Sequence, residues 1–151
     1  MQDVLIKPND DGLYDIQIDG ADFASAEGFE TAIPTSLFSD ARASSIQVEN
    51  AKDRRGWVGN VLFIDIDREL GGLLWTLDQV RITENILNFA KTFAQDSLQW
   101  MLDDNIAKNI FVSVEKVSDR SIKIFTNITT IDNQVQRYVT LWKKTDINRT
   151  I

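Results

Sequence analysis

The strongest hydrophobic pattern in the chain runs from Thr83 to Asp104, where apolar residues recur every three or four positions. At about 100° per residue they share one broad arc, and polar residues occupy the opposite arc. Thr83 is a suitable N-cap, and Glu84 in the first turn complements the helix dipole. The pattern predicts a long amphipathic helix that buries its apolar arc in the core. That arc comprises Ile86, Phe89, Ala90, Phe93, Ala94, Ser97, Trp100 and Met101.

The C-terminal part of the chain alternates apolar and polar residues with the period of two that is typical of strands. Three such segments are separated by the turn sequences Ser118-Asp119 and Asp132-Asn133. Short polar turns between alternating segments predict an antiparallel meander. The predicted strands are 109–117, 121–129 and 134–142, and the middle one places Ile122, Ile124, Thr126 and Ile128 on one face.

The N-terminal part of the chain carries shorter signals. Residues 13–18 alternate in polarity between two Asp-Gly sequences, which predicts a short strand between two turns. Phe29, Ile33 and Leu37 are spaced as on a helix, but a proline fits a helix only in its first turn. The helix is therefore predicted to begin at about Pro34 and to end at about residue 41.

The segment between the two predicted helices is less regular. Residues 44–60 are mostly polar and predict a long surface loop, and loops of that length are often functional. Residues 61–66 predict a strand or an extended segment. Gly71-Gly72 predicts a turn at which the backbone passes close to a neighbouring segment.

Together these elements predict an α+β fold. A small antiparallel or mixed sheet, which includes the C-terminal meander, packs against one long amphipathic helix and a shorter N-terminal helix. The 151 residues suit a single domain, taken as 1–151, that is large enough to bury a core. The polar tail at about 143–151 is expected to be flexible.

Composition limits the chemistry that this chain can perform. It has no cysteine and no histidine, which excludes disulfides, thiolate zinc sites, cysteine nucleophiles and every triad that needs an imidazole base. Its net charge of −7 argues against nucleic acid as a partner, because phosphate binding needs a basic surface. The sequence shows no signal peptide and no apolar run long enough to cross a membrane, so no membrane association is expected.

Carboxylates are the remaining candidates for catalysis or metal binding. Two carboxyl groups about 5–10 Å apart across a cleft would suit a glycosidase, and oxygen ligands would suit calcium or magnesium. The 23 acidic residues make such pairs common by chance, and no EF-hand pattern is present. Surface acids are the simpler interpretation, so no catalytic residue, cofactor or metal ion is predicted. The candidate residues are Glu27, Glu30, Asp65, Asp67 and Glu69.

The polar loop contains residues that suit protein binding. Arg54, Arg55 and Trp57 stand close together in it, and arginine and tryptophan are frequent at binding hot spots. The alternative is that Trp57 anchors the loop to the core. Trp75 and Trp100 are interpreted as packing residues.

The C-terminal strands suggest a second binding feature. A terminal hairpin rich in Ile, Val and Thr can leave an open edge that accepts a strand from a partner, unless the chain covers that edge itself. The predicted protein interface therefore comprises Arg42, Arg54, Arg55 and Trp57 together with Ile124, Thr126, Tyr138, Thr140 and Trp142.

Several segments, in their order and spacing along nearly the whole chain, resemble the baseplate wedge proteins of Mu-like contractile-tailed phages. That family is related to the sheath-initiator protein of T4-like phages and to type VI secretion baseplate proteins. The matching segments are Glu30-Thr31-Ala32, Ser36-Leu37-Phe38-Ser39-Asp40-Ala41-Arg42-Ala43, Arg55-Gly56-Trp57-Val58-Gly59-Asn60, Gly72-Leu73-Leu74-Trp75, Leu98-Gln99-Trp100-Met101-Leu102-Asp103-Asp104 and Tyr138-Val139-Thr140-Leu141-Trp142.

This resemblance implies a small α+β virion protein of the tail baseplate without enzymatic activity, present in six copies around the hub and assembled in the host cytoplasm. It would contact baseplate wedge subunits on one side and the tail sheath protein on the other, with hub or tube proteins as further partners. Sheath segments would extend its sheet by strand addition and so nucleate the sheath. A cell-wall glycosidase of the tail and the equivalent component of a tailocin or secretion system remain the alternatives.

Overall fold

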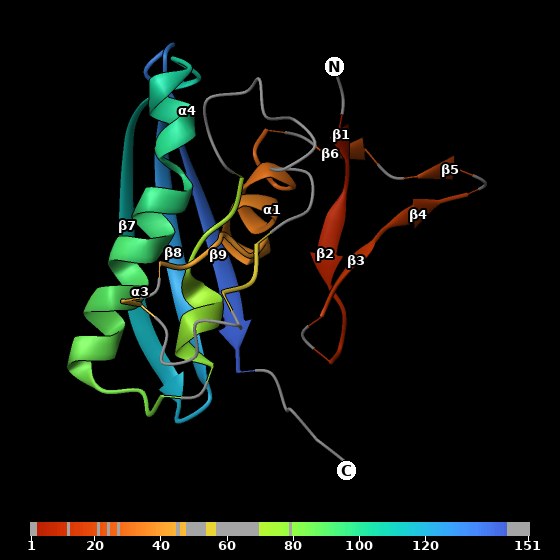
Figure 1. Cartoon of the computed structure of the whole chain (residues 1–151). Coiled ribbons are helices and arrows are strands. Elements are labelled where there is room, and N and C mark those ends of the chain that lie inside the picture. The colour runs from red at the N-terminus through yellow and green to blue at the C-terminus, as the bar shows by residue number, and fades with distance from the viewer. Residues whose placement is uncertain are drawn as a thin grey trace.

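The structure of this protein, a computed structural model, places helices on one face of a three-stranded antiparallel sheet (Figure 1). A set of short strand pairs from the N-terminal segment lies beside this two-layered body, on the side of the last strand (Figure 1). The predicted α+β fold is confirmed. The residues that the structure describes are 3–11, 13–20, 22–23, 25–26, 28–44, 46–47, 54–56, 70–78 and 80–144.

The sheet consists of β7 (Ala107–Ser118), β8 (Ser121–Thr130) and β9 (Val135–Lys143) in the order β7-β8-β9. Both pairings are antiparallel, so the predicted meander is confirmed, with strand bounds within two residues of those predicted. Val112 of β7 lies opposite Thr126 of β8, which lies opposite Tyr138 of β9. Because side chains alternate along a strand, the even-numbered residues of all three strands point to one face.

The even-numbered face of the sheet forms the floor of the core. Val112, Ile122, Ile124 and Ile128 on it are fully buried, and each contributes on the order of 2 kcal/mol through removal of apolar surface from water. Helix α3 (Glu84–Ser97) lies on this face, and its buried residues include alanines, which let the helix approach the sheet closely.

The predicted long helix is divided into α3 and α4 (Gln99–Asp103), with Leu98 between them. The hydroxyl of Ser97 donates to the Ala94 carbonyl oxygen at 2.8 Å. A serine side chain that bonds back to the preceding turn competes with the main-chain ladder and bends helices. At the other end the predicted N-cap is confirmed, since the Thr83 hydroxyl accepts a hydrogen bond from the Ile86 N–H at 3.4 Å.

For one residue of the predicted apolar arc, the prediction of burial is wrong. Phe89 is 53% exposed, although its position suggested burial in the core. The buried stripe of the helix runs through Ala90, Ala94 and Ser97, so Phe89 lies one residue to the side of it. Its ring instead stacks on Phe93 with a centroid separation of 6.1 Å.

The shorter helix, α1, spans Ala32–Phe38 and so ends three residues before the predicted end. Pro34 lies in its first turn, where its missing N–H breaks no hydrogen bond. The helix ends because the chain after it pairs with another segment. The Ala41 N–H donates to the Gly72 carbonyl at 3.0 Å, and the Gly72 N–H donates to the Ser39 carbonyl at 2.9 Å. The close backbone approach predicted at Gly71-Gly72 is thereby confirmed.

The N-terminal segment forms three two-stranded antiparallel pairs, β1–β6, β2–β3 and β4–β5. The strand predicted at 13–18 is confirmed in part, because it is interrupted between β3 and β4 at Gln17, whose N–H bonds to the Leu5 carbonyl at 2.9 Å. The elements are β1 (Asp3–Val4), β2 (Ile6–Pro8), β3 (Tyr14–Ile16), β4 (Ile18–Asp19), β5 (Asp22–Phe23) and β6 (Ser25–Ala26).

The segment before α3 contributes a short 3-10 helix, η1 (Leu74–Leu77), whose Leu74 and Leu77 are buried. The strand predicted at 61–66, most of the loop predicted at 44–60 and the tail beyond residue 144 lie outside the described residues. None of the helices in the described part of the chain is long and apolar enough to span a membrane.

Candidate functional site

Along the outer margin of β9, no other described strand pairs with the main-chain N–H and C=O groups. The Thr130 N–H bonds to the Gln134 carbonyl, and the Lys144 N–H bonds to the Arg120 carbonyl. In an antiparallel pair, hydrogen-bonded and non-bonded positions alternate. The even-numbered residues of β9 therefore bond to β8. The odd-numbered residues direct their N–H and C=O groups away from the sheet.

The first half of this margin is open. Val135 and Val139 are 57% and 60% exposed, and Arg137 between them is also exposed. Their outward main-chain groups have no hydrogen-bond partner among the described residues. Three successive outward-facing residues form a strand-length template for a partner's main chain.

The opposite margin of the sheet, along β7, is covered in its middle. There the even-numbered residues face outward, and Val112 is 0% exposed while Ile110 is 6% exposed. Helix α3 packs on β7, and its Lys91 ammonium lies 5.7 Å from the ring centroid of Phe111. Because charged and bulky side chains over an edge prevent pairing, β9 offers the open margin of the two.

Tyr14 from β3 covers the second half of the β9 margin. Burial raises the pKa of its hydroxyl, and hydrogen bonds from the Thr140 hydroxyl and the Leu141 N–H lower that pKa by a smaller amount. Its ring packs on Phe38 with a centroid separation of 5.1 Å. The chain thus covers part of its own edge and leaves the residues from Val135 to Val139 uncovered.

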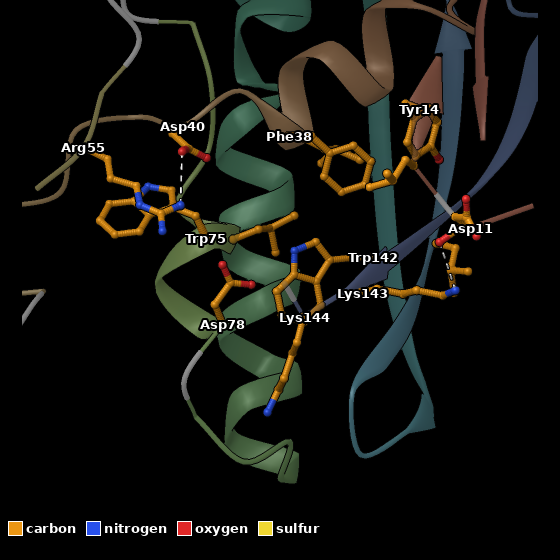
Figure 2. Close-up of a pocket in the computed structure, with 14 residues that line it drawn as sticks. Asp11, Tyr14, Phe38, Asp40, Arg55, Trp75, Asp78, Trp142, Lys143 and Lys144 are labelled. Atoms are coloured by element: carbon orange, nitrogen blue, oxygen red, sulfur yellow. Dashed lines mark hydrogen bonds and ion pairs between the residues drawn. The ribbon is translucent and has the colours of Figure 1, made fainter. Parts of the chain in front are cut away.

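Two cavities lie along β9, and Tyr14 lines both. The smaller, of about 210 Å³, lies between β9, the β2–β3 hairpin and the start of α1, and Val139 lines it. The larger, of about 540 Å³, lies at the end of β9 and is bounded by η1 and the end of α1 (Figure 2). Its wall includes Leu37, Phe38, Leu74, Trp75, Leu141 and Trp142, with Asp11, Asp40, Asp78, Arg55, Lys143 and Lys144 also lining it.

Arg55, a residue predicted to bind a partner, lines the larger cavity. Its guanidinium lies 3.3 Å from the Asp40 carboxylate and 4.7 Å from the ring centroid of Trp75 (Figure 2). Both side chains of the ion pair are more than a third exposed, so the pair adds little stability. The neighbouring Arg54 is half-buried, and its Nε donates to the Ala43 carbonyl at 2.6 Å. Its guanidinium is therefore partly engaged within the chain.

Arg42 is exposed and lies next to the same loop, since a Cβ on Gly56 would stand 3.2 Å from the Arg42 Cβ. The structure thus brings Arg42, Arg54 and Arg55 together near the end of α1. Trp57 lies outside the described residues.

The five interface residues predicted on the strands are placed differently from that expectation. Ile124 and Thr126 belong to β8, which is the central strand and has both margins paired, and both are fully buried. Thr140 and Trp142 on β9 are also buried, because even-numbered residues face the helices. The main-chain groups left unpaired along β9 belong to its odd-numbered residues, and binding through the five predicted residues stays a prediction.

Tyr138, the fifth of these residues, is half-buried and fixes the entry to α1. Its hydroxyl accepts a hydrogen bond from the Phe29 N–H at 3.0 Å and donates to Gln136 Oε1 at 2.5 Å. Gly28 lies close to this pair, because a Cβ there would stand 2.8 Å from the Tyr138 hydroxyl. Tyr138 therefore acts within the fold.

Sequence reasoning missed Tyr14 and Val139 as residues of the site. The alternation within β9 divides its residues correctly into two faces, but it does not say which face is buried. Tyr14 carried no local signal of its role, because its contacts with Thr140 and Leu141 come from the far end of the chain.

The described residues contain no cluster of three or more acidic side chains that could hold a metal ion. Of the five carboxylates considered for a glycosidase or a metal site, Glu30 alone belongs to the described residues, and it lines the smaller cavity.

Two buried threonines on neighbouring strands provide a test of the inner face. The Thr126 hydroxyl is sealed from solvent without a partner among the described residues, whereas the Thr140 hydroxyl bonds to Tyr14. Removing an unpaired buried hydroxyl relieves a desolvation cost, but removing a paired one leaves its partner unsatisfied. Thr126→Val is expected to raise the free energy of unfolding by about 1 kcal/mol, and Thr140→Val to lower it by about 1 kcal/mol.

Urea unfolding followed by circular dichroism measures both variants under the same conditions. Changes of the same sign in the two variants would show that Thr126 has a hydrogen-bond partner after all, or that Thr140 has none.

The fold and its surface define a small two-layer α+β protein whose described part offers main-chain groups at a sheet margin beside an aromatic cavity. In other proteins an open sheet margin of this kind can accept a strand from a partner. The chain belongs to the family described as phage protein GP46, whose model matches residues 29–137. The match confirms the predicted resemblance to a Mu-like baseplate family.

Two relatives are similar to this chain. The baseplate protein gp46 of Escherichia phage Mu is 30% identical over 129 residues, which cover 84% of this chain and 87% of that protein. The Mu-like prophage FluMu protein gp46 of Haemophilus influenzae is 33% identical over 86 residues, which cover 57% of this chain and 56% of that protein.

Proposed function

We propose that this protein is a structural, non-enzymatic component of the baseplate of a contractile phage tail. It links wedge subunits to the first ring of the sheath and nucleates the sheath by accepting a strand at the β9 margin. The open main-chain groups of Val135, Arg137 and Val139 are the observation that carries this proposal. The baseplate setting is supported by the Mu relative, which is named a baseplate protein.

Strand addition suits a sheath nucleus for a physical reason. Main-chain hydrogen bonds supply affinity with little dependence on the partner's sequence, and the alternating side chains set its register. An incoming strand would bond to Val135, Arg137 and Val139, and Tyr14 would end the ladder at Leu141. The tail sheath protein is the proposed donor of that strand.

The second contact surface in this proposal is the arginine-rich loop. Arg42, Arg54, Arg55 and Trp57 would hold wedge subunits, with hub or tube proteins as further neighbours and six copies around the hub. The Arg55 guanidinium is available for this, because its ion pair with Asp40 is partly exposed and exchangeable with a partner's carboxylate. The assembled protein would lie in the virion, after assembly in the host cytoplasm.

A proline at Val139 tests strand addition. The Val139 N–H points away from β8, so proline removes a group that only a partner would use, and edge strands tolerate proline at such positions. Losing one hydrogen bond and leaving the partner's carbonyl unpaired costs about 1–3 kcal/mol, which is a loss of roughly 5- to 150-fold in strand affinity. Val139→Pro is therefore expected to fold but to give baseplates that do not start a sheath.

Val139→Ala is the matched control, because it shortens the same side chain and keeps the N–H. Complementation of a phage that lacks this gene, scored by plaque yield and by electron microscopy of sheathed tails, separates the two variants. Sheathed tails at the normal yield from a folded Val139→Pro protein would refute the proposal.

A further inference from the structure

The larger cavity contains a hydrogen-bond donor that the protein itself does not use. Trp142 is only 6% exposed, and its indole N–H has no acceptor among the described residues. Thr126 Oγ1 is the one side-chain polar atom of the described residues that is both sealed and unpaired. The Trp142 indole nitrogen is therefore not sealed, and it reaches the open space of the cavity that Trp142 lines (Figure 2).

Two other indoles of the chain are satisfied internally. Trp75 Nε1 donates to the Ala41 carbonyl at 2.9 Å, and Trp100 Nε1 donates to Ser36 Oγ at 3.0 Å. A buried tryptophan N–H usually finds a partner, whereas the Trp142 donor faces the cavity and is left for solvent or for a bound group.

The lining of the cavity indicates an uncharged ligand with an apolar part. Three carboxylates and three cations line it, so their formal charges cancel. Arg55 pairs with Asp40, while the Lys143 and Lys144 ammonium groups donate to the main-chain carbonyls of Asp11 and Val80. This balance favours a neutral acceptor over a carboxylate or phosphate. The apolar walls suit an aliphatic or aromatic side chain.

We propose that this cavity binds a peptide segment of a partner protein. The segment places one large aliphatic or aromatic side chain against the apolar wall of the cavity, and its main-chain carbonyl accepts the hydrogen bond from Trp142. A peptide fits because the cavity lies beyond Tyr14 at the end of the same strand, where Leu141 and Lys143 of β9 line it. The inference rests on the proposed function only for the identity of the protein that supplies the segment.

The test uses the three described indoles within one sample of the full chain. In ¹⁵N-labelled protein, the indole N–H of Trp142 is expected to exchange with water at least about tenfold faster than those of Trp75 and Trp100, because it lacks their hydrogen bonds. Single Trp→Phe variants, including Trp57→Phe, assign the four resonances. Exchange at Trp142 as slow as at Trp100 would overturn the inference, and this measurement needs no variant to remain folded.

The binding probe is N-acetyl-leucine methylamide, with N-acetyl-glycine methylamide as the matched control that lacks the side chain. The leucine probe is expected to shift the Trp142 indole resonance in a saturable way at millimolar concentration, while the Trp100 resonance, which lies outside the cavity, stays in place. Equal shifts from both probes, or no shift from either, would overturn the proposal.

The same experiments keep this inference separate from the proposed function. A selective shift of Trp142 combined with normal sheath assembly by Val139→Pro would support the peptide site and refute strand addition. Loss of assembly in Val139→Pro without any shift of Trp142 would refute the peptide site and leave the baseplate role in place.

Discussion

Replacing Gly71 by alanine is expected to lower the free energy of unfolding by about 3 kcal/mol or more. Gly71 has a φ of +119°, a conformation that residues with a side chain rarely adopt. A Cβ on it would also stand 2.5 Å from the Ser39 carbonyl oxygen and 3.0 Å from the Ala41 nitrogen. Both neighbours are main-chain atoms that pair with Gly72, so they have no room to move away.

Gly20→Ala is the matched control for this substitution. Gly20 also has a positive φ, of +66°, but a Cβ there would meet nothing within 4 Å. Its cost is limited to backbone conformation and is expected to be about 1 kcal/mol. Chemical denaturation of the two variants compares them, and equal losses of stability would show that the contact with residues 39–41 is unimportant.

The Gly71 position also supports the candidate site. Gly72 pairs with Asp40, the carboxylate that binds Arg55, and Trp75 follows three residues later. The end of α1 and η1 form two walls of the larger cavity. A displacement of the chain at Gly71 would move these two walls apart.

Truncating a buried side chain on the inner face of the sheet and an exposed one on its outer face is expected to change the free energy of unfolding by very different amounts. Ile124→Ala should lower the free energy of unfolding by about 2–5 kcal/mol, because Ile124 is fully buried beneath the helices and the substitution leaves a cavity. Val139→Ala should change it by no more than about 0.5 kcal/mol, because Val139 is exposed on the other face. The two residues belong to neighbouring strands, and Ile124 lies opposite Thr140.

Urea unfolding of both variants measures this contrast. A mild effect of Ile124→Ala would mean that the inner face is loosely packed and that Ile124 is available to a partner, as the sequence first suggested. A large effect of Val139→Ala would mean that the outer face of the sheet is packed in the isolated chain.

The two proposed binding features would recognise a peptide in different ways. The β9 margin offers main-chain hydrogen bonds, which accept many sequences, whereas the larger cavity offers a shaped apolar space and one indole donor, which select among side chains. Tyr14 lies between them and lines both cavities. If the proposed role in starting the sheath holds, the two features would act together, the margin giving affinity and the cavity setting the register.

Local sequence determined the elements that have strong periodicity or local chemistry. The strands β7, β8 and β9 follow from alternation and turn residues, and α3 begins at Thr83 because its hydroxyl can cap the helix that follows. The sequence also predicted the close approach of two backbone segments at Gly71-Gly72, because glycine has no side chain to prevent it. These features depend on neighbours along the chain, so a sequence pattern suffices to predict them.

Tertiary structure alone decided which sheet margin is open and which side chains reach it. Helix α3 crosses to β7 and covers that edge, while Tyr14 from the other end of the chain covers Leu141 and leaves Val139 free. The burial of Ile124 and the exposure of Phe89 have the same origin, since the position of a helix over a sheet decides which of its flanks is covered. Periodicity shows which residues of an element share a face, whereas packing between distant segments decides which face is exposed to solvent.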